Sequence, residues 1–203
     1  SLRDEYEFVS ILKQRFGEAE MNRLMELYRA NFIKERDFAM VHRFGMNVVR
    51  IPFNYTLLED DAKPFQMKET GVKWLDQAIE WARKHKLYVI LDLHGTQGRQ
   101  SLDHTSGHAG QNKLWSDAQC QARLVWLWKT LAERYRDNAT VAMYDVINEP
   151  FGDCKTQDHT PQVVQVMDRI YKAIRSVDTN HIILFADSRE GVEFYGDPKD
   201  HGW

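Results

Sequence analysis

The sequence of 203 residues lacks several features that would indicate particular classes of protein. No stretch reaches the roughly 18 consecutive apolar residues of a membrane-spanning helix, so we expect no membrane partner. Acidic residues outnumber basic ones only slightly, 30 to 27, and a net charge of −3 provides no basic surface for a nucleic acid. The two cysteines, Cys120 and Cys154, fit no metal-ligand spacing and give no basis for inferring a disulfide.

Linker-like segments are scarce as well. The chain has 5 prolines and 11 glycines, and they do not cluster with serine into a flexible tract. We therefore expect one domain over residues 1–203, long enough to bury a sizeable core.

Short apolar runs rich in β-branched residues recur along the chain and predict strands. They show little alternation of polar and apolar residues, which is typical of parallel strands covered on both faces. The runs are Asn47–Ile51, Tyr88–Asp92, Ala142–Ile147 and His181–Phe185.

Amphipathic helices are predicted before and between these strands. An early helix spans about Asp4–Tyr28, and the apolar stripe of the next one stops at Gly45, a residue typical of the position just after a helix. Another apolar stripe runs through residues 74–82. Ser116–Gln119 has the spacing of a capping box, and Thr160–Pro161 predicts an N-cap followed by a first-turn proline.

Strands that alternate with helices predict a parallel α/β fold. The long loops follow the strands, which favours a TIM barrel whose carboxyl-terminal rim carries the function. A doubly wound open sheet is the alternative, although its glycine-rich phosphate-binding turns are missing from the sequence.

Polar residues stand out at the ends of three predicted strands. They are Arg50, His94 and the pair Asn148 and Glu149, which would share one rim of a parallel sheet. A carboxyl group that is partly desolvated there has a raised pKa and can protonate a leaving group, while an arginine can hold a neighbouring carboxylate in its ionised form. Taken singly, each residue also fits a structural role, such as an ion pair for Arg50 or a core position for His94.

Three segments together resemble glycoside hydrolase family 5. They are NVVRIPFNY (47–55), YVILDLHGTQGRQ (88–100) and YDVINEP (144–150), and the residues upstream resemble the exo-β-1,3-glucanase and β-glucanase branch. The resemblance implies a (β/α)8 barrel that hydrolyses a β-linked oligo- or polysaccharide with retention of configuration. It implies no cofactor and no metal, and it suggests a secreted or periplasmic location.

The same resemblance implies roles for individual residues. Glu149 would be the general acid/base, Asn148 would bind the 2-hydroxyl of the sugar, Arg50 would steady the nucleophile and His94 would line the −1 subsite. Tyr55 and Trp115 are candidate platforms for sugar stacking, with ordinary packing as the alternative for both.

The sequence departs from the family pattern in its number of strands. Its four predicted strands correspond to the second to fifth of the barrel, and the nucleophile glutamate at the end of the seventh is not expected before Trp203. Glu190 and Glu193 follow the last predicted strand, and the pattern assigns neither of them this role. A complete barrel takes about 250 residues, so we predict roughly half a barrel.

Several outcomes follow from half a barrel. The chain is a fragment of a longer enzyme, pairs with a second copy into an eight-stranded ring, or folds as an open sheet whose edges its own N-terminal helices protect. We expect the isolated chain to be inactive or very weak. The alternatives are a non-catalytic carbohydrate-binding or scaffold protein, and a cellulase or mannanase of the same clan.

Overall fold

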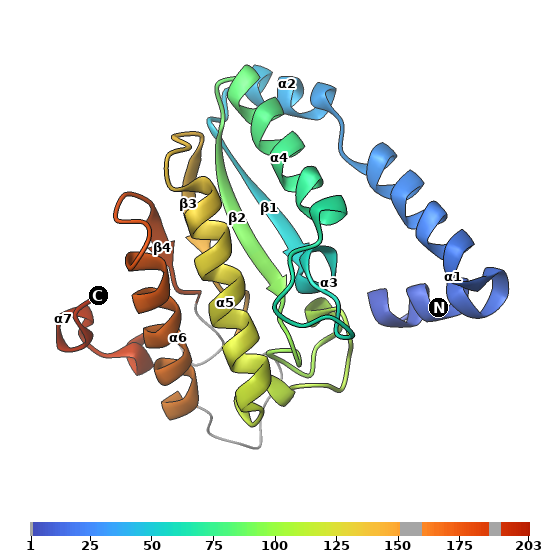
Figure 1. The fold of residues 1–203 in the computed structure, drawn as a ribbon. Coiled ribbons are helices and arrows are strands. Elements are labelled where there is room, and N and C mark those ends of the chain that lie inside the picture. Colours follow the sequence, from blue (N-terminus) through green and yellow to red (C-terminus); the bar gives the residue numbers. More distant parts are fainter. Residues whose placement is uncertain (1, 151–159, 187–191) are drawn as a thin grey trace.

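The computed structural model describes residues 2–150, 160–186 and 192–203 (Figure 1). The described strands form one parallel sheet in the order β1-β2-β3-β4. They are β1 Val48–Asn54, β2 Tyr88–Gly95, β3 Val141–Asp145 and β4 Ile182–Leu184. The predicted parallel strands are confirmed. Cys154 and Glu190 lie outside the described residues.

Three long helices connect successive strands and lie together on one face of the sheet (Figure 1). They are α4 Glu69–Lys84, α5 Ala118–Tyr135 and α6 Thr160–Arg175. A doubly wound sheet carries its helices on both faces, whereas a barrel carries them all outside. The arrangement is that of a partial (β/α)8 barrel, as the sequence predicted.

The remaining elements lie around this layer. They are α1 Glu5–Phe32, α2 Glu35–Arg43, α3 Tyr55–Leu58 and α7 Pro198–His201, with the 3-10 turns η1 His104–Ser106, η2 Lys113–Trp115 and η3 Glu193–Tyr195. The predicted early helix is confirmed as α1, which has a kink at Gly17 (φ 80°). Gly45 follows α2 with φ 81°, as expected for a glycine after a helix end.

The predicted capping box before α5 is wrong by one residue. Asp117, not Ser116, caps the helix, because its Oδ1 accepts hydrogen bonds from the amides of Gln119 and Cys120 at 2.8 and 3.1 Å. The Ser116 hydroxyl instead donates to the carbonyl of Lys113 at 3.4 Å.

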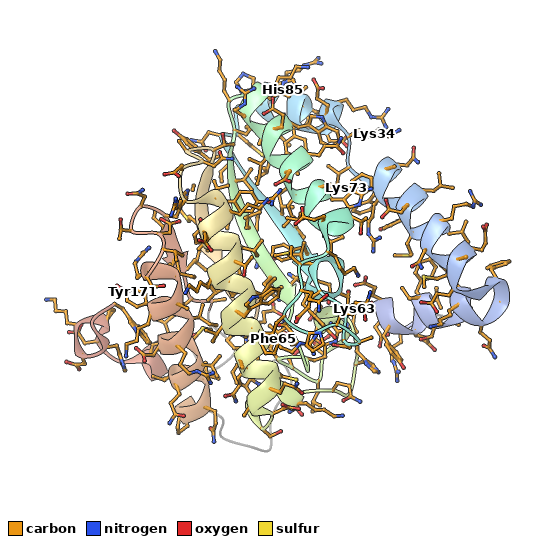
Figure 2. The ribbon with its side chains drawn as sticks, viewed as in Figure 1. Lys34, Lys63, Phe65, Lys73, His85 and Tyr171 are labelled. Atoms are coloured by element: carbon orange, nitrogen blue, oxygen red, sulfur yellow. The ribbon has the colours of Figure 1, made fainter. Side chains whose placement is uncertain are left out.

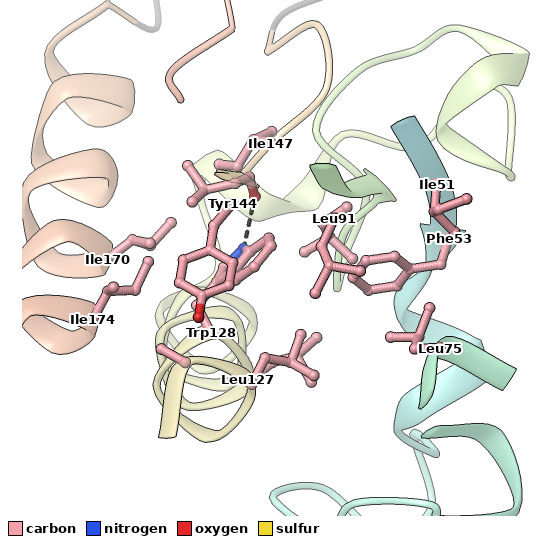
Figure 3. Close-up of a cluster of buried hydrophobic side chains, with 14 of the residues drawn as sticks. Ile51, Phe53, Leu75, Leu91, Leu127, Trp128, Tyr144, Ile147, Ile170 and Ile174 are labelled. Carbon is pink, nitrogen blue, oxygen red and sulfur yellow. Dashed lines mark hydrogen bonds between the residues drawn. The ribbon is translucent and has the colours of Figure 1, made fainter. Parts of the chain in front are cut away.

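The core lies between the sheet and the three long helices. In Figure 3 Tyr144 lies beside Trp128, with Ile170 and Ile174 of α6 on one side and Leu91 on the other. All five side chains are fully buried, and each contributes about 2–3 kcal/mol through loss of apolar surface to water. The Trp128 indole N–H donates to the carbonyl of Val146 at 2.8 Å, so the polar atom of the largest core residue is satisfied.

The opposite face of the sheet is largely uncovered by the described residues. Val48, Tyr88 and Ile182 point to this inner face and are 40%, 53% and 54% exposed, whereas Val89 and Leu91 on the helix side are fully buried. The sequence predicted strands covered on both faces, and for the described part of the chain that prediction is wrong. No described strand pairs with the outer edge of β1 or of β4.

Helix α1 lies beyond the β1 edge, separated from the other helices (Figure 1). Lys73 of α4 points toward it and forms an ion pair with Glu26 at 2.7 Å (Figure 2). An apolar cavity of about 700 Å³ lies between α1, β1 and α4 and is lined by side chains such as Phe32 and Trp81. None of the helices in the described parts of the chain is both long and apolar enough to cross a membrane.

Candidate active site

The predicted rim residues Arg50, His94 and Asn148 come together, because Arg50 in the middle of β1 reaches toward the carboxyl end of β2 and the segment after β3. Parallel pairing in register brings these strand ends side by side, so residues far apart in the sequence meet. Arg50 Nη2 donates to Asn148 Oδ1 at 2.9 Å, and Asn148 Nδ2 lies 3.5 Å from His94 Nε2. Three of the four residues predicted at this rim therefore form one connected cluster.

Two aspartates that were not predicted from the sequence complete this cluster. Asp92 Oδ2 lies 3.0 Å from Arg50 Nη1, and Asp145 Oδ2 accepts from Arg50 Nε at 2.9 Å. The two aspartates are register partners on β2 and β3 and are almost completely buried. The signal that could have found them is an acidic residue within each of two apolar strands, two residues before His94 and three residues before Asn148.

The electrostatics of the cluster are dominated by two buried carboxylates that share one guanidinium. Burial raises the pKa of Asp145, and the neighbouring Asp92 charge acts in the same direction, while the hydrogen bond from Arg50 opposes both. The Oδ1 atoms of Asp92 and Asp145 have no hydrogen-bond partner among the described residues. The Arg50 side chain is 39% exposed, so the described residues cover it only in part.

Glu149 follows this cluster and differs from it in being exposed. Its backbone has φ 40°, in the left-handed region that residues other than glycine rarely adopt. The backbone of the preceding residue, Asn148, is held on both sides. Its backbone N–H donates to the Leu93 carbonyl at 3.2 Å, and its backbone carbonyl accepts from Gln100 Nε2 at 2.9 Å. The surrounding hydrogen bonds thus hold a strained backbone that presents the Glu149 carboxylate to solvent.

Gln100 is a third residue that was not predicted from the sequence. Its Nε2 donates to the carbonyls of both His94 and Asn148 at 2.9 Å, and its Oε1 accepts from the Thr96 amide at 3.1 Å. One buried side chain therefore ties the loop after β2 to the loop after β3.

The structure corrects the prediction that Tyr55 and Trp115 are stacking platforms. Each is only 4% exposed, and a sugar needs an open ring face. The Tyr55 ring has the guanidinium groups of Arg99 and Arg123 at 5.0 and 5.7 Å, and its hydroxyl donates to Asp61 at 2.9 Å. Trp115 Nε1 donates to the Gln100 carbonyl at 2.8 Å. Ordinary packing, the alternative, describes both residues.

Comparisons with known proteins agree with this architecture. A family model described as cellulase (glycosyl hydrolase family 5) matches residues 13–200. A β-xylosidase of Phanerodontia chrysosporium is 33% identical over 196 residues, which cover 95% of this chain and 40% of that protein. A glucan 1,3-β-glucosidase of Candida oleophila is 31% identical over 203 residues, which cover 96% of this chain and 45% of that protein.

Solved structures show the same fold. The rutinosidase from Aspergillus niger superimposes with a TM-score of 0.79 at 17% identity, covering 91% of this chain and 54% of that one. The endoglucanase Cel5A from Thermotoga maritima gives 0.63 at 24% identity, covering 82% and 50%. The chain thus spans about half the length of these relatives or less. With a family match over most of its length and the fold of these hydrolases, the chain belongs to glycoside hydrolase family 5.

Proposed function

We propose that this chain carries the acid/base part of a retaining β-glycosidase site, with Glu149 as the proton donor. The observation that carries the proposal is the placement of Glu149 directly after Asn148. Both Arg50 and His94 contact the side-chain amide of Asn148. An exposed carboxyl group beside a fixed hydrogen-bonding amide is the arrangement that glycosidic-bond cleavage requires on the leaving-group side.

The chemistry divides between two carboxyl groups. Glu149 gives its proton to the glycosidic oxygen as the bond to the anomeric carbon breaks, and a second carboxylate from outside the described residues forms a covalent bond to that carbon. The Glu149 carboxylate then takes a proton from water, which attacks the anomeric carbon and releases the second carboxylate. Arg50, whose side chain is partly exposed, steadies the second carboxylate, and His94 lines the sugar subsite.

A β-linked glucan is the proposed substrate. Similarity over nearly the whole chain to a protein named glucan 1,3-β-glucosidase supports this choice. Relatives named endoglucanase, such as that of Acetivibrio thermocellus at 30% identity, keep a cellulose-like substrate as an alternative within the same chemistry.

The proposal is tested with a glucose-derived imidazole, a transition-state analogue whose ring nitrogen accepts a hydrogen bond where the leaving oxygen lies. We expect calorimetry to show binding to the chain and at least about tenfold weaker binding to Glu149→Gln, because one charge-assisted hydrogen bond is lost. Glu193→Gln, an exposed residue of η3, is the matched control and leaves the affinity unchanged. Absence of binding to the unmodified chain, or equal affinity for Glu149→Gln, would overturn the proposal.

A non-catalytic carbohydrate-binding protein is the second candidate. The observation that favours it is that Asp92 and Asp145, the carboxylates nearest the cluster, are both buried and held by Arg50, so neither is free to attack a sugar. This candidate predicts oligosaccharide binding that survives Glu149→Gln, and no hydrolysis of an aryl β-glucoside at any protein concentration.

Self-assembly is part of the proposal because the sheet is open. Two copies related by a twofold axis close an eight-stranded ring, with β4 of each copy beside β1 of the other. The unpaired outer edges of β1 and β4 in the described part of the chain support this arrangement. Sedimentation equilibrium is expected to give twice the chain mass of 23.9 kDa. A soluble monomer at all concentrations would exclude the ring.

A further inference from the structure

We propose that Asp92 is a positioning residue that fixes the tautomer of His94 and, through it, the orientation of the Asn148 amide. This inference rests on the proposed function, since it concerns the amide beside the proton donor Glu149. It assigns a task to a buried carboxylate that takes no part in the proposed proton transfer.

Four side chains at the site form a closed circuit of contacts. Asp92 Oδ2 lies 3.0 Å from Arg50 Nη1 and 2.8 Å from His94 Nδ1. His94 Nε2 lies 3.5 Å from Asn148 Nδ2, and Asn148 Oδ1 accepts from Arg50 Nη2 at 2.9 Å. Four side chains from β1, β2 and the end of β3 thus contact one another in a ring.

The hydrogens around this ring follow from which groups donate and which accept. Arginine donates only, so the Asn148 oxygen must face Arg50 and its NH2 group must face His94. An ionised carboxylate accepts only, so His94 Nδ1 must carry the hydrogen that points to Asp92. Neutral His94 with hydrogen on Nδ1 then offers the Nε2 lone pair to the Asn148 NH2 group. The other neutral tautomer would set a lone pair against the carboxylate and an N–H against the amide N–H.

The orientation of the Asn148 amide determines which of its hydrogens can reach a ligand. Asn148 is almost completely buried, and both its backbone groups are hydrogen-bonded, so its side chain has little freedom. With one N–H of the amide directed at His94, the second N–H has a single direction and is the one available to a sugar hydroxyl. By holding the His94 tautomer, Asp92 preserves a donor for the 2-hydroxyl group of the sugar.

Asp145 provides a matched comparison. It is the register partner of Asp92, is equally buried and binds the same guanidinium through Arg50 Nε at 2.9 Å. None of the hydrogen bonds found among the described residues joins it to His94 or Asn148. Removing Asp145 therefore deletes one carboxylate beside Arg50 and leaves the contacts of the His94 imidazole intact. Removing Asp92 deletes a carboxylate beside Arg50 and also the hydrogen-bond partner of His94 Nδ1.

The test reads the His94 tautomer directly by long-range proton–nitrogen NMR on the whole chain at neutral pH, with the signal assigned from a His94→Gln spectrum. We expect hydrogen on Nδ1 in the unmodified chain and in Asp145→Ala, and a shift toward hydrogen on Nε2 in Asp92→Ala. Hydrogen on Nε2 in the unmodified chain would overturn the proposal without the need for any variant. So would an unchanged tautomer in a folded Asp92→Ala protein.

A second measurement connects the tautomer to the sugar. Asp92→Ala is expected to weaken binding of the glucose-derived imidazole at least about tenfold, and to weaken a 2-deoxy analogue much less, because that analogue lacks the hydroxyl that Asn148 binds. Equal losses for both ligands would refute the link to Asn148. If neither ligand binds the unmodified chain, the proposed function fails, while the NMR result still decides the role of Asp92.

Discussion

At the scale of single residues, Glu149 combines an exposed carboxyl group with a left-handed backbone conformation (φ 40°). This conformation costs free energy for any residue that has a Cβ atom. Left-handed geometry costs about 1–2 kcal/mol for such a residue, and glycine avoids most of this cost. The strain lies next to Asn148, whose backbone groups are both hydrogen-bonded. The position that we propose for the proton donor is therefore one where the backbone lowers stability.

Replacement of Glu149 by glycine should expose this trade-off. We expect Glu149→Gly to raise the free energy of unfolding by about 1 kcal/mol, because the strain is released, while ligand binding at the site is weakened. Urea denaturation of Glu149→Gly and of Glu149→Ala is the measurement. Alanine also removes the carboxylate but keeps the Cβ atom, so an equal gain in both variants would show that the gain does not come from the backbone.

Individual residues also show where reasoning from the sequence stops. Arg50, His94 and Asn148 were predictable as neighbours because each ends or interrupts an apolar strand, and parallel strands align their ends. Asp92 and Asp145 were missed because their role depends on Arg50 reaching across two strands, which periodicity does not reveal. The burial of Tyr55 was missed for the same reason, since Arg99 and Arg123 reach it from other segments.

At the scale of elements, the strands and helices were largely predictable from local patterns, but the exact start of α5 was not. Ser116 and Asp117 are both good capping residues, and the choice depends on the 3-10 turn η2 before them. That turn leaves Asp117 facing the free amides and occupies the Ser116 hydroxyl with the carbonyl of Lys113.

Asp117→Ala is expected to lower the free energy of unfolding by about 1 kcal/mol, because two helix amides lose their acceptor. Ser116→Ala, the matched neighbour, should change it by less than about 0.5 kcal/mol. Thermal or urea unfolding of both variants measures the difference. If Ser116→Ala lost more unfolding free energy than Asp117→Ala, Ser116 and not Asp117 would be the N-cap of α5.

The connection between α6 and β4 is held by a buried acid. Asp178 Oδ2 accepts from the Tyr144 hydroxyl at 2.7 Å and lies 2.6 Å from His181 Nδ1, and its Oδ1 accepts from the Asn180 and His181 amides. Burial alone would raise the pKa of Asp178, but these hydrogen bonds outweigh it, so the pKa of this carboxyl is lowered.

A lowered pKa makes this connection sensitive to acid. The stability that ionised Asp178 provides is present above the usual aspartate pKa of about 3.9 and is lost as the pH falls through the lower value in the folded state. Asp178→Asn is expected to cost about 2 kcal/mol at pH 7 and progressively less below about pH 4. Unfolding free energies of both proteins from pH 7 to pH 3 test this, and a constant difference would contradict it.

At the scale of the whole molecule, the fold has one well-packed face and one open face. The helices bury the core on one side, while Val48, Tyr88 and Ile182 leave apolar surface exposed on the other. Exposed apolar surface beside unpaired strand edges favours association between chains.

Charges on the open face should reduce this association. We expect the double variant Tyr88→Glu and Ile182→Lys to lower the sedimentation coefficient at high protein concentration relative to the unmodified chain. Phe16→Lys, an equally exposed apolar residue on α1, is the control and should leave sedimentation unchanged. Identical sedimentation of all three proteins would show that the inner face does not mediate contacts.

The hydrogen bonds of Gln100 have a consequence for how the rim opens. Since one amide group binds the carbonyls of both His94 and Asn148, neither loop can move away without breaking a bond that also restrains the other. The two loops then behave as one cooperative unit in local unfolding, with a shared opening free energy in hydrogen exchange. His94 and Glu149, the proposed proton donor, would then gain or lose their geometry in the same event.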